Sequence, residues 1–293
     1  IRFTLTGDRL AGFAVIGNAG LPITGQRVDS VAPNKVLSSL TQEETSLIKG
    51  AEATIWSEMV TDNLLDLRLW PRMYAVAEQM WGSAHKPNGS TLYSRLAFVD
   101  MWSRLSVGAK QYEQHAHALH RALGADISDA EKAAVQLLEP AHYYHRHHIK
   151  SSENKYSAYE PLNELADALK VESVTVIRFN RLLKQWQRNE STAALSELFT
   201  AIQDWRFTIK RATDAGNPEL MPHLNTLRVQ VNQIDEILKK LENGHTLSQQ
   251  AMGRLRSDIE KMRQPENEII AAPVLALETL YFHMLSLSSG TKK

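Results

Sequence analysis

The sequence contains no cysteine, no long uninterrupted apolar segment and no excess of charge of either sign. The absence of cysteine excludes a disulfide framework, but it does not decide the compartment, because exported proteins need not use disulfides. No apolar run reaches the roughly 18 residues that a transmembrane helix needs, so we expect no membrane span. The 33 basic and 33 acidic residues balance, which indicates neither nucleic acid nor an anionic membrane surface as a partner.

The 293 residues suffice for one large domain or two, and a hydrophobic content of 43% is enough for a packed core. The chain begins at Ile1, inside a segment that already alternates like a strand, and it has no initiator methionine. We therefore expect it to be a piece of a longer protein.

Residues 1–30 read as β structure. Apolar and polar residues alternate from Ile1 to Thr6, Gly7-Asp8 supplies turn chemistry, and a second apolar run covers residues 10–16. Together with a connector that follows, this predicts a β-rich insertion over residues 1–49.

The most informative stretch runs from Gly50 to Gly82. Its first part alternates up to Trp56 and stops at Ser57-Glu58, which predicts a buried strand leading directly into an apolar helix. Such a pair is half of a βαβ unit, and in α/β barrels the carboxyl end of the strand holds binding groups. Trp56 and Glu58 lie at that end, two residues apart, so their side chains point to the same side.

The segment from Leu64 to Trp81 is apolar almost all round, which predicts burial between layers. A proline cannot continue a helix without losing a hydrogen bond, so Pro71 predicts two segments, 63–70 and 71–81.

Four charged residues accompany this strand and helix. Unpaired charges in a dry region are costly. We expect Arg68 or Arg72 to form a structural ion pair with Glu78 or Glu52.

From residue 111 onward the pattern is helical, with breaks at 216–218, 243–244 and 264–265. This predicts an all-helical bundle over residues 111–293 and no regular strand after residue 110. The adjacent acids Asp235 and Glu236 lie in mid-helix, where we expect a solvated face.

Residues 50–105 resemble the end of the catalytic barrel in glycoside hydrolase family 20, the β-N-acetylhexosaminidases. The family pattern there is G-x-E-A-x-x-W-x-E, then R-x-W-P-R-x-x-A-x-A-E-x-x-W, and a Y-x-R-L matched by Tyr93-Ser94-Arg95-Leu96. The first two parts are matched at Gly50, Glu52, Ala53, Trp56, Glu58, Arg68, Trp70, Pro71, Arg72, Ala75, Ala77, Glu78 and Trp81.

The resemblance implies a mainly helical α+β chain. Residues 50–110 would hold the last strand and helix of a (β/α)8 TIM barrel, after the insertion at 1–49 and before a helical C-terminal domain at 111–293. Trp56 would line the pocket for a terminal N-acetyl sugar, and Glu58 would accept hydrogen bonds from sugar hydroxyls. Sugars offer an apolar C–H face that suits an indole ring and hydroxyls that suit a carboxylate.

The resemblance further implies a glycoside hydrolase that removes terminal β-linked N-acetylglucosamine or N-acetylgalactosamine from chitooligosaccharides or glycans, as in chitin degradation. The family uses substrate-assisted retaining catalysis and no cofactor. Its catalytic Asp-Glu pair belongs to an H-x-G-G-D-E motif that does not occur in this sequence. We therefore expect no catalytic residue in this chain, the pair upstream of Ile1, and the rest of the barrel as a partner. By resemblance, the location would be periplasmic or extracellular.

Two other hypotheses arise from the residues themselves. The cluster from His142 to His148 suggests zinc, but only His145 and His147 have strand spacing and no third ligand is indicated, so we expect no metal there. His115, His117 and His120 are expected at the surface. The alternative function is a non-catalytic helical interaction module or carbohydrate-binding module, in which Trp56 and Glu58 are structural remnants.

Overall fold

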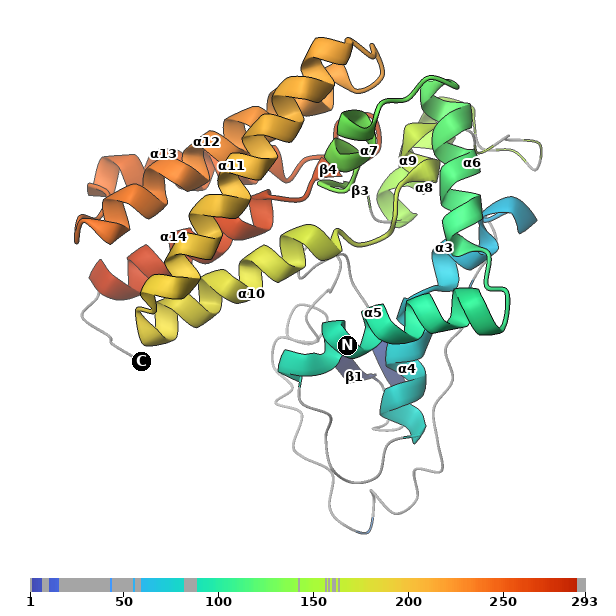
Figure 1. Ribbon diagram of the computed structural model, residues 1–293, viewed down its shortest axis with the longest axis horizontal. Helices are drawn as coiled ribbons and strands as arrows, with labels where there is room; N and C mark the ends of the chain where they lie inside the picture. The colour runs from blue at the N-terminus through green and yellow to red at the C-terminus, as the bar shows by residue number, and fades with distance from the viewer. Residues whose placement is uncertain are drawn as a thin grey trace. The chain divides into compact units, whose positions relative to one another are not determined.

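The computed structural model describes residues 2–6, 11–15, 43, 55, 59–81, 89–141, 143–155, 157, 159, 162 and 164–288. It divides into two compact units, residues 1–115 and 116–293 (Figure 1). The first unit contains an antiparallel hairpin of β1 (Arg2–Thr6) and β2 (Ala11–Val15), in which Arg2 lies opposite Val15. The strands predicted on either side of Gly7-Asp8 are confirmed.

The helices of the first unit follow one another closely. They are η2 (Asp62–Leu64), α3 (Leu65–Leu69), α4 (Arg72–Trp81), α5 (Gly89–Ser106) and the start of α6 (Gln111–Leu123). The predicted break at Pro71 is confirmed, because α3 ends at Leu69 and α4 begins at Arg72.

The apolar segment around Pro71 is buried on one side only. Leu64, Leu67 and Val76 are buried, whereas Leu65 is 40% exposed. Within the described part of the unit, α4 packs against α3 and α5. The predicted burial between two layers is therefore wrong for these residues, since no described layer covers the other side.

The second unit is a helical bundle. Its helices are α7 (Asp129–Val135), α8 (Tyr143–Ser152), α9 (Leu165–Ala168), α10 (Val174–Asn189), α11 (Thr192–Ala215), α12 (Met221–Glu242), α13 (Gln249–Met262) and α14 (Val274–Ser288). Serine side chains accept hydrogen bonds from backbone N–H groups at the starts of α7, α10, α11 and α13, which satisfies donors that a helix leaves unpaired. Gly216 ends α11 in the left-handed conformation, as the predicted break requires.

The core of this unit forms around α14. This helix packs beside α10, α12 and α13 (Figure 1). Val274, Leu277 and Leu280 on it are completely buried. Burial of each large apolar side chain contributes about 1.5–3 kcal/mol, so α14 is a principal source of stability for the bundle.

A short antiparallel pair of strands corrects the prediction of an all-helical region. β3 (Leu138–Pro140) pairs with β4 (Ile269–Ala271), with Leu138 opposite Ala271. The pairing continues in the bond from Ala141 N to Glu268 O, 2.7 Å long. Each strand is only three residues long, and its partner lies about 130 residues away, so local periodicity could not predict it.

Buried charges tie α8 and α9 to the residues before β4. Arg146 donates from Nη2 to Asp167 (2.6 Å) and from Nε to Glu268 (2.5 Å). Lys150, whose side chain is 1% exposed, lies 3.3 Å from Glu268 and 3.2 Å from Glu164. Burial acts to lower the pKa of Arg146, but Asp167 and Glu268 outweigh it and raise the pKa above its ordinary value. We call these five residues the buried ionic cluster.

Glu268 occupies the centre of this cluster in an unusual backbone conformation. Its φ angle is 64°, in the left-handed region that side chains other than glycine seldom adopt. The two oxygens of its carboxylate reach different cations, Oε2 to Arg146 and Oε1 to Lys150. The electrostatic gain from neutralising two buried cations offsets the unfavourable backbone geometry.

Two predictions of exposed polar residues are wrong. Asp235 is buried and lies 2.8 Å from Arg206 and 2.7 Å from Lys239, while Glu236 is exposed as expected. The partner Arg206 comes from α11, so its approach could not be read from the sequence of α12. His115 is also buried, because it lies on the face of α6 that the first unit covers.

We predict that Glu268→Gln lowers the free energy of unfolding of the second unit by about 3–5 kcal/mol. The substitution keeps the shape of the side chain but leaves Arg146 and Lys150 buried with less negative charge. Urea denaturation followed by circular dichroism measures the change. Glu260→Gln is the matched control, because Glu260 pairs with Arg256 at the surface and such pairs contribute about 0–1 kcal/mol. Equal effects of the two changes would contradict a structural role for the cluster.

A second prediction concerns acid stability. Burial lowers the pKa of His223 below its ordinary value of 6.5, although Glu266 and Glu219 oppose the shift. The folded state therefore favours the neutral ring, and this contribution is complete above pH 6.5 and lost as the pH falls through the lowered pKa. We expect His223→Gln to reduce the fall in melting temperature between neutral and mildly acidic pH. His245→Gln, at an exposed position, is the control, and a parallel shift of both variants would contradict the assignment.

Candidate functional site

The residues predicted to bind substrate, Trp56 and Glu58, lie outside the described residues, as does Glu52. The structure instead describes the platform that follows them in the chain. Met59 and Leu64 are buried there, and η2 and α3 begin within a few residues of Glu58. We call residues 59–69 the platform, and its attachments determine how rigid the chain is immediately after the predicted site.

Side chains of α6 and the residue before it hold the platform in place. Gln114 donates from Nε2 to the carbonyl of Asp62 (2.9 Å) and accepts at Oε1 from the N–H of Leu67 (3.0 Å). Asp66 accepts from the N–H of Lys110 at 2.8 Å. One glutamine thus bridges a carbonyl and an N–H within the first turns after the predicted strand, where backbone groups otherwise lack helical partners.

A second polar cluster joins α5 to α6. Asp100 accepts from Gln111 Nε2 at 2.7 Å and from the hydroxyl of Tyr112 at 2.5 Å. Burial, together with the hydrogen bond to Asp100, raises the pKa of Tyr112 to about 12. The guanidinium of Arg104 lies over the Tyr112 ring at 5.0 Å, which fits a cation–π contact. Tyr112 therefore stays protonated at neutral pH and acts as a structural donor.

The residues of the R-x-W-P-R pattern contribute mainly packing. The Trp70 and Tyr74 rings stack with centroids 4.3 Å apart, and burial raises the pKa of Tyr74 although a hydrogen bond with Ser103 opposes the shift. Arg68 and Arg72 are half-buried.

Glu78 forms its ion pair with Arg95 of α5, rather than with Arg68 or Arg72 as we expected. Arg95 reaches it because α5 packs directly on α4. The ion pair therefore joins two of the sequence patterns that carry the family resemblance. Helix packing between separate segments decided this partner, which spacing within one helix could not indicate.

The histidine cluster lies on α8, apart from His142, which falls outside the described residues. The rings of His147 and His148 meet edge to face, with centroids 5.7 Å apart. Across the described ranges, no group of three or more His, Asp or Glu side chains is arranged to hold a metal ion. Two neighbours of the histidines, Arg146 and Lys150, belong to the buried ionic cluster.

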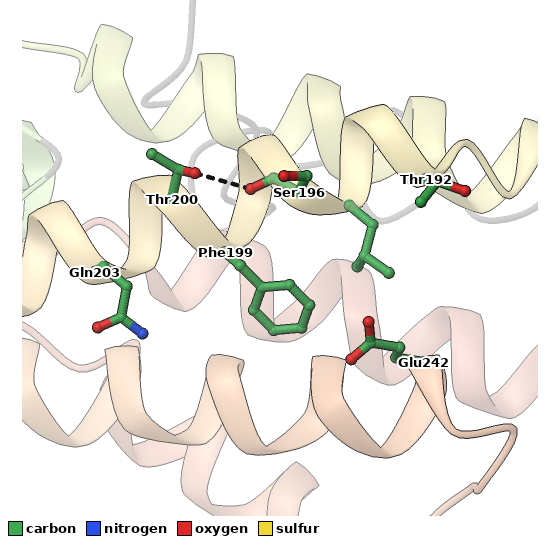
Figure 2. Close-up of a pocket in the computed structure, with 7 residues that line it drawn as sticks. Thr192, Ser196, Phe199, Thr200, Gln203 and Glu242 are labelled. Carbon is green, nitrogen blue, oxygen red and sulfur yellow. Dashed lines mark hydrogen bonds between the residues drawn. The ribbon is translucent and has the colours of Figure 1, made fainter.

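The second unit also has surface hollows. One of about 360 Å³ lies between α11 and the end of α12, where the Phe199 ring points toward α12 and Glu242 (Figure 2). Thr200 donates to the carbonyl of Ser196 at 3.0 Å. Glu242 is the only carboxylate among its lining residues, so this hollow lacks the two carboxylates of ordinary glycoside hydrolysis.

Comparison with known proteins places the platform in a class of carbohydrate-cleaving enzymes. Residues 20–84 match the sequence profile of the catalytic domain of glycosyl hydrolase family 20. The matched range contains Trp56, Glu58 and the platform.

More specifically, the chain is similar to β-hexosaminidases. It is 42% identical over 57 residues to the mouse (Mus musculus) β-hexosaminidase subunit alpha, a match of 20% of this chain and 11% of that protein. It is 41% identical over 56 residues to the human (Homo sapiens) subunit beta, or 19% of this chain and 10% of that protein. The chain thus spans about a tenth of the length of the curated relatives it matches.

A solved structure extends the similarity through most of the chain. The fold resembles that of a Flavobacterium johnsoniae chitobiase with a TM-score of 0.66 and 22% sequence identity, over 83% of this chain and 36% of the chitobiase chain. The protein is therefore β-hexosaminidase-like in its matched segment and chitobiase-like in fold. Among the described helices, none combines the length and apolar character needed to cross a lipid bilayer.

We predict that Gln114→Leu loosens the platform. The change leaves the Asp62 carbonyl and the Leu67 N–H without their partner, at a cost of about 1–3 kcal/mol for an unsatisfied buried group. Amide hydrogen exchange at Leu67 and its α3 neighbours should accelerate, because local opening becomes easier. Glu113→Ala changes an exposed neighbour on α6 and should leave α3 unaffected. Unchanged exchange in Gln114→Leu would show that other contacts hold the platform.

Proposed function

We propose that this chain is the C-terminal part of a β-N-acetylhexosaminidase, and that residues 50–82 supply the last strand and helix of its TIM barrel. The observation that carries the proposal is the match of residues 20–84 to a family 20 catalytic domain, at the segment that contains Trp56 and Glu58. The fold similarity to a chitobiase over 83% of the chain supports the same assignment for the helical region at 111–293.

In this proposal, Trp56 and Glu58 bind the terminal N-acetyl sugar. The indole stacks on the apolar face of the sugar ring, and the carboxylate accepts hydrogen bonds from its hydroxyls. The platform fixes the chain just after Glu58, since Gln114 holds both Asp62 and Leu67. Rigid attachment of this kind keeps a binding group in its productive position.

The chemical step needs groups that this sequence does not contain. In substrate-assisted catalysis the acetamido oxygen of the sugar attacks the anomeric carbon, one carboxylate orients the acetamido group, and a carboxylic acid protonates the leaving oxygen. No H-x-G-G-D-E motif is present to supply the two acids. The longer enzyme would contribute them, with N-acetylglucosamine- or N-acetylgalactosamine-terminated chains as substrates.

The alternative, a non-catalytic helical or carbohydrate-binding module, makes a different demand on the sequence. It requires no catalytic pair in the preceding reading frame and no loss of turnover when Trp56 or Glu58 is changed. Sequencing the gene upstream of Ile1 distinguishes the two, because an H-x-G-G-D-E motif within a barrel pattern supports the enzyme and its absence supports the module.

We predict that Glu58→Gln in the longer gene product lowers kcat/KM for a chromogenic β-N-acetylglucosaminide. Loss of a charge-assisted hydrogen bond is worth about 1.5–3 kcal/mol, or about ten- to hundredfold in rate. Trp56→Ala should cost at least as much, and Glu113→Gln, at an exposed site in α6, should cost nothing. Unchanged kinetics together with a sharply lower melting temperature for Glu58→Gln would make Glu58 structural and overturn the site.

We also predict that residues 1–293 alone release no aglycone from the same substrate, since an acid must lie within about 3 Å of the leaving oxygen. Assaying the chain beside the longer product tests this. Comparable turnover by both would place the acids within this sequence and contradict the proposal.

A further inference from the structure

One face of α5 is apolar and exposed over its last three turns. Phe98, Met101, Trp102 and Leu105 follow one another at intervals of three or four residues, and Val107 extends the row beyond the helix. Residues at this spacing share one side of a helix. Between 52% and 78% of each of these side chains is exposed. We call these five residues the α5 face.

The α5 face differs from ordinary scattered surface residues. It contains two aromatic rings and no charge, and apolar surface gathered into one contiguous stripe marks an interaction site. The exposed apolar residues of α12, by contrast, include only Val229 among the large side chains that are exposed in that helix.

The other side of α5 is already engaged within the first unit, so the helix cannot rotate to bury the face. Arg95 pairs with Glu78 of α4. Asp100 binds Gln111 and Tyr112 at 2.7 and 2.5 Å. Ser103 is buried and donates to the carbonyl of Asp100. Rotation would break these contacts and bury an unpaired carboxylate, which is costly.

The comparisons indicate what covers the face. α5 begins at Gly89, five residues after the end of the match to a family 20 catalytic domain. The chitobiase of similar fold has most of its length without a counterpart here, since this chain covers only 36% of it. An apolar helix face next to a partial catalytic domain is complementary to the apolar outer face of a further barrel helix.

We propose that the α5 face is the docking surface for the catalytic-barrel polypeptide of the longer β-hexosaminidase, an inference that rests on the proposed function. The partner is an apolar helix surface of that barrel, in contact with Phe98, Met101, Trp102 and Leu105. The ion pair of Arg95 and the bonds of Asp100 aim the face outward before the partner arrives.

Hydroxyl-radical footprinting with mass spectrometry tests the proposal, because methionine and aromatic side chains report their own exposure. We expect oxidation of Met101 and Trp102 to fall severalfold in the longer gene product relative to residues 1–293 alone. Phe207 of α11, exposed at 62%, is the internal control and should be oxidised equally in both. Equal oxidation of Met101 in both proteins would overturn the proposal.

Two other outcomes would also overturn it by identifying a different occupant. Protection of Met101 in monomeric residues 1–293 would mean that this chain covers its own face. Protection that grows with protein concentration, together with a dimer mass in analytical ultracentrifugation, would mean that a second copy covers it.

A charged substitution supplies an independent readout. Leu105→Glu should sharply reduce the soluble yield and melting temperature of the longer product, yet leave the circular dichroism of residues 1–293 unchanged. Val229→Glu, on an exposed position of α12, should affect neither. A Leu105→Glu protein that is as stable as the parent would overturn the docking surface. Turnover is measured separately, so a protected α5 face in a product without hexosaminidase activity would refute the proposed function and retain the docking surface.

Discussion

The buried carboxylate of Glu268 is the contact on which the second unit depends. It neutralises two cations of α8, Arg146 and Lys150, and its backbone carbonyl receives the N–H of Ala141. Because a buried charge without a partner costs several kcal/mol, neither cation could remain in place if residue 268 moved away. The left-handed conformation of Glu268 is a consequence of this requirement, since it carries the carboxylate toward both cations while the chain turns into β4.

The first unit meets a similar requirement with neutral donors. The platform after the predicted sugar site has few helical hydrogen bonds, because η2 and α3 are short. Gln114 and Asp66 supply the missing partners through α6 and Lys110. The position of the predicted binding residues therefore depends on a helix some 50 residues later in the chain, and Asp100 in turn fixes that helix to α5.

Local chemistry made much of this fold predictable. Serine caps, the break at Pro71 and the glycine end of α11 each follow from the backbone needs of a few adjacent residues. Partners from distant segments were not predictable. Asp235 is buried because Arg206 on another helix accompanies it, and β3 pairs with a strand that no local pattern announces. The motif led to the family match, whereas the roles of Trp56 and Glu58 remain predictions, since neither lies among the described residues.

The pairing of β3 with β4 has a consequence for synthesis. Residues 138 and 271 lie side by side, and α10 to α13 are all contained in the chain between them. A chain emerging from the ribosome at about 5–20 residues per second would therefore spend several seconds or more with these helices formed but the strands unpaired. During that interval α8 would carry Arg146 and Lys150 without Glu268, and α14 would not yet be present to fill the core. The bundle thus completes its fold only after residue 271 has left the exit tunnel, and chaperone binding to the exposed apolar faces of α10, α12 and α13 would be concentrated in that period.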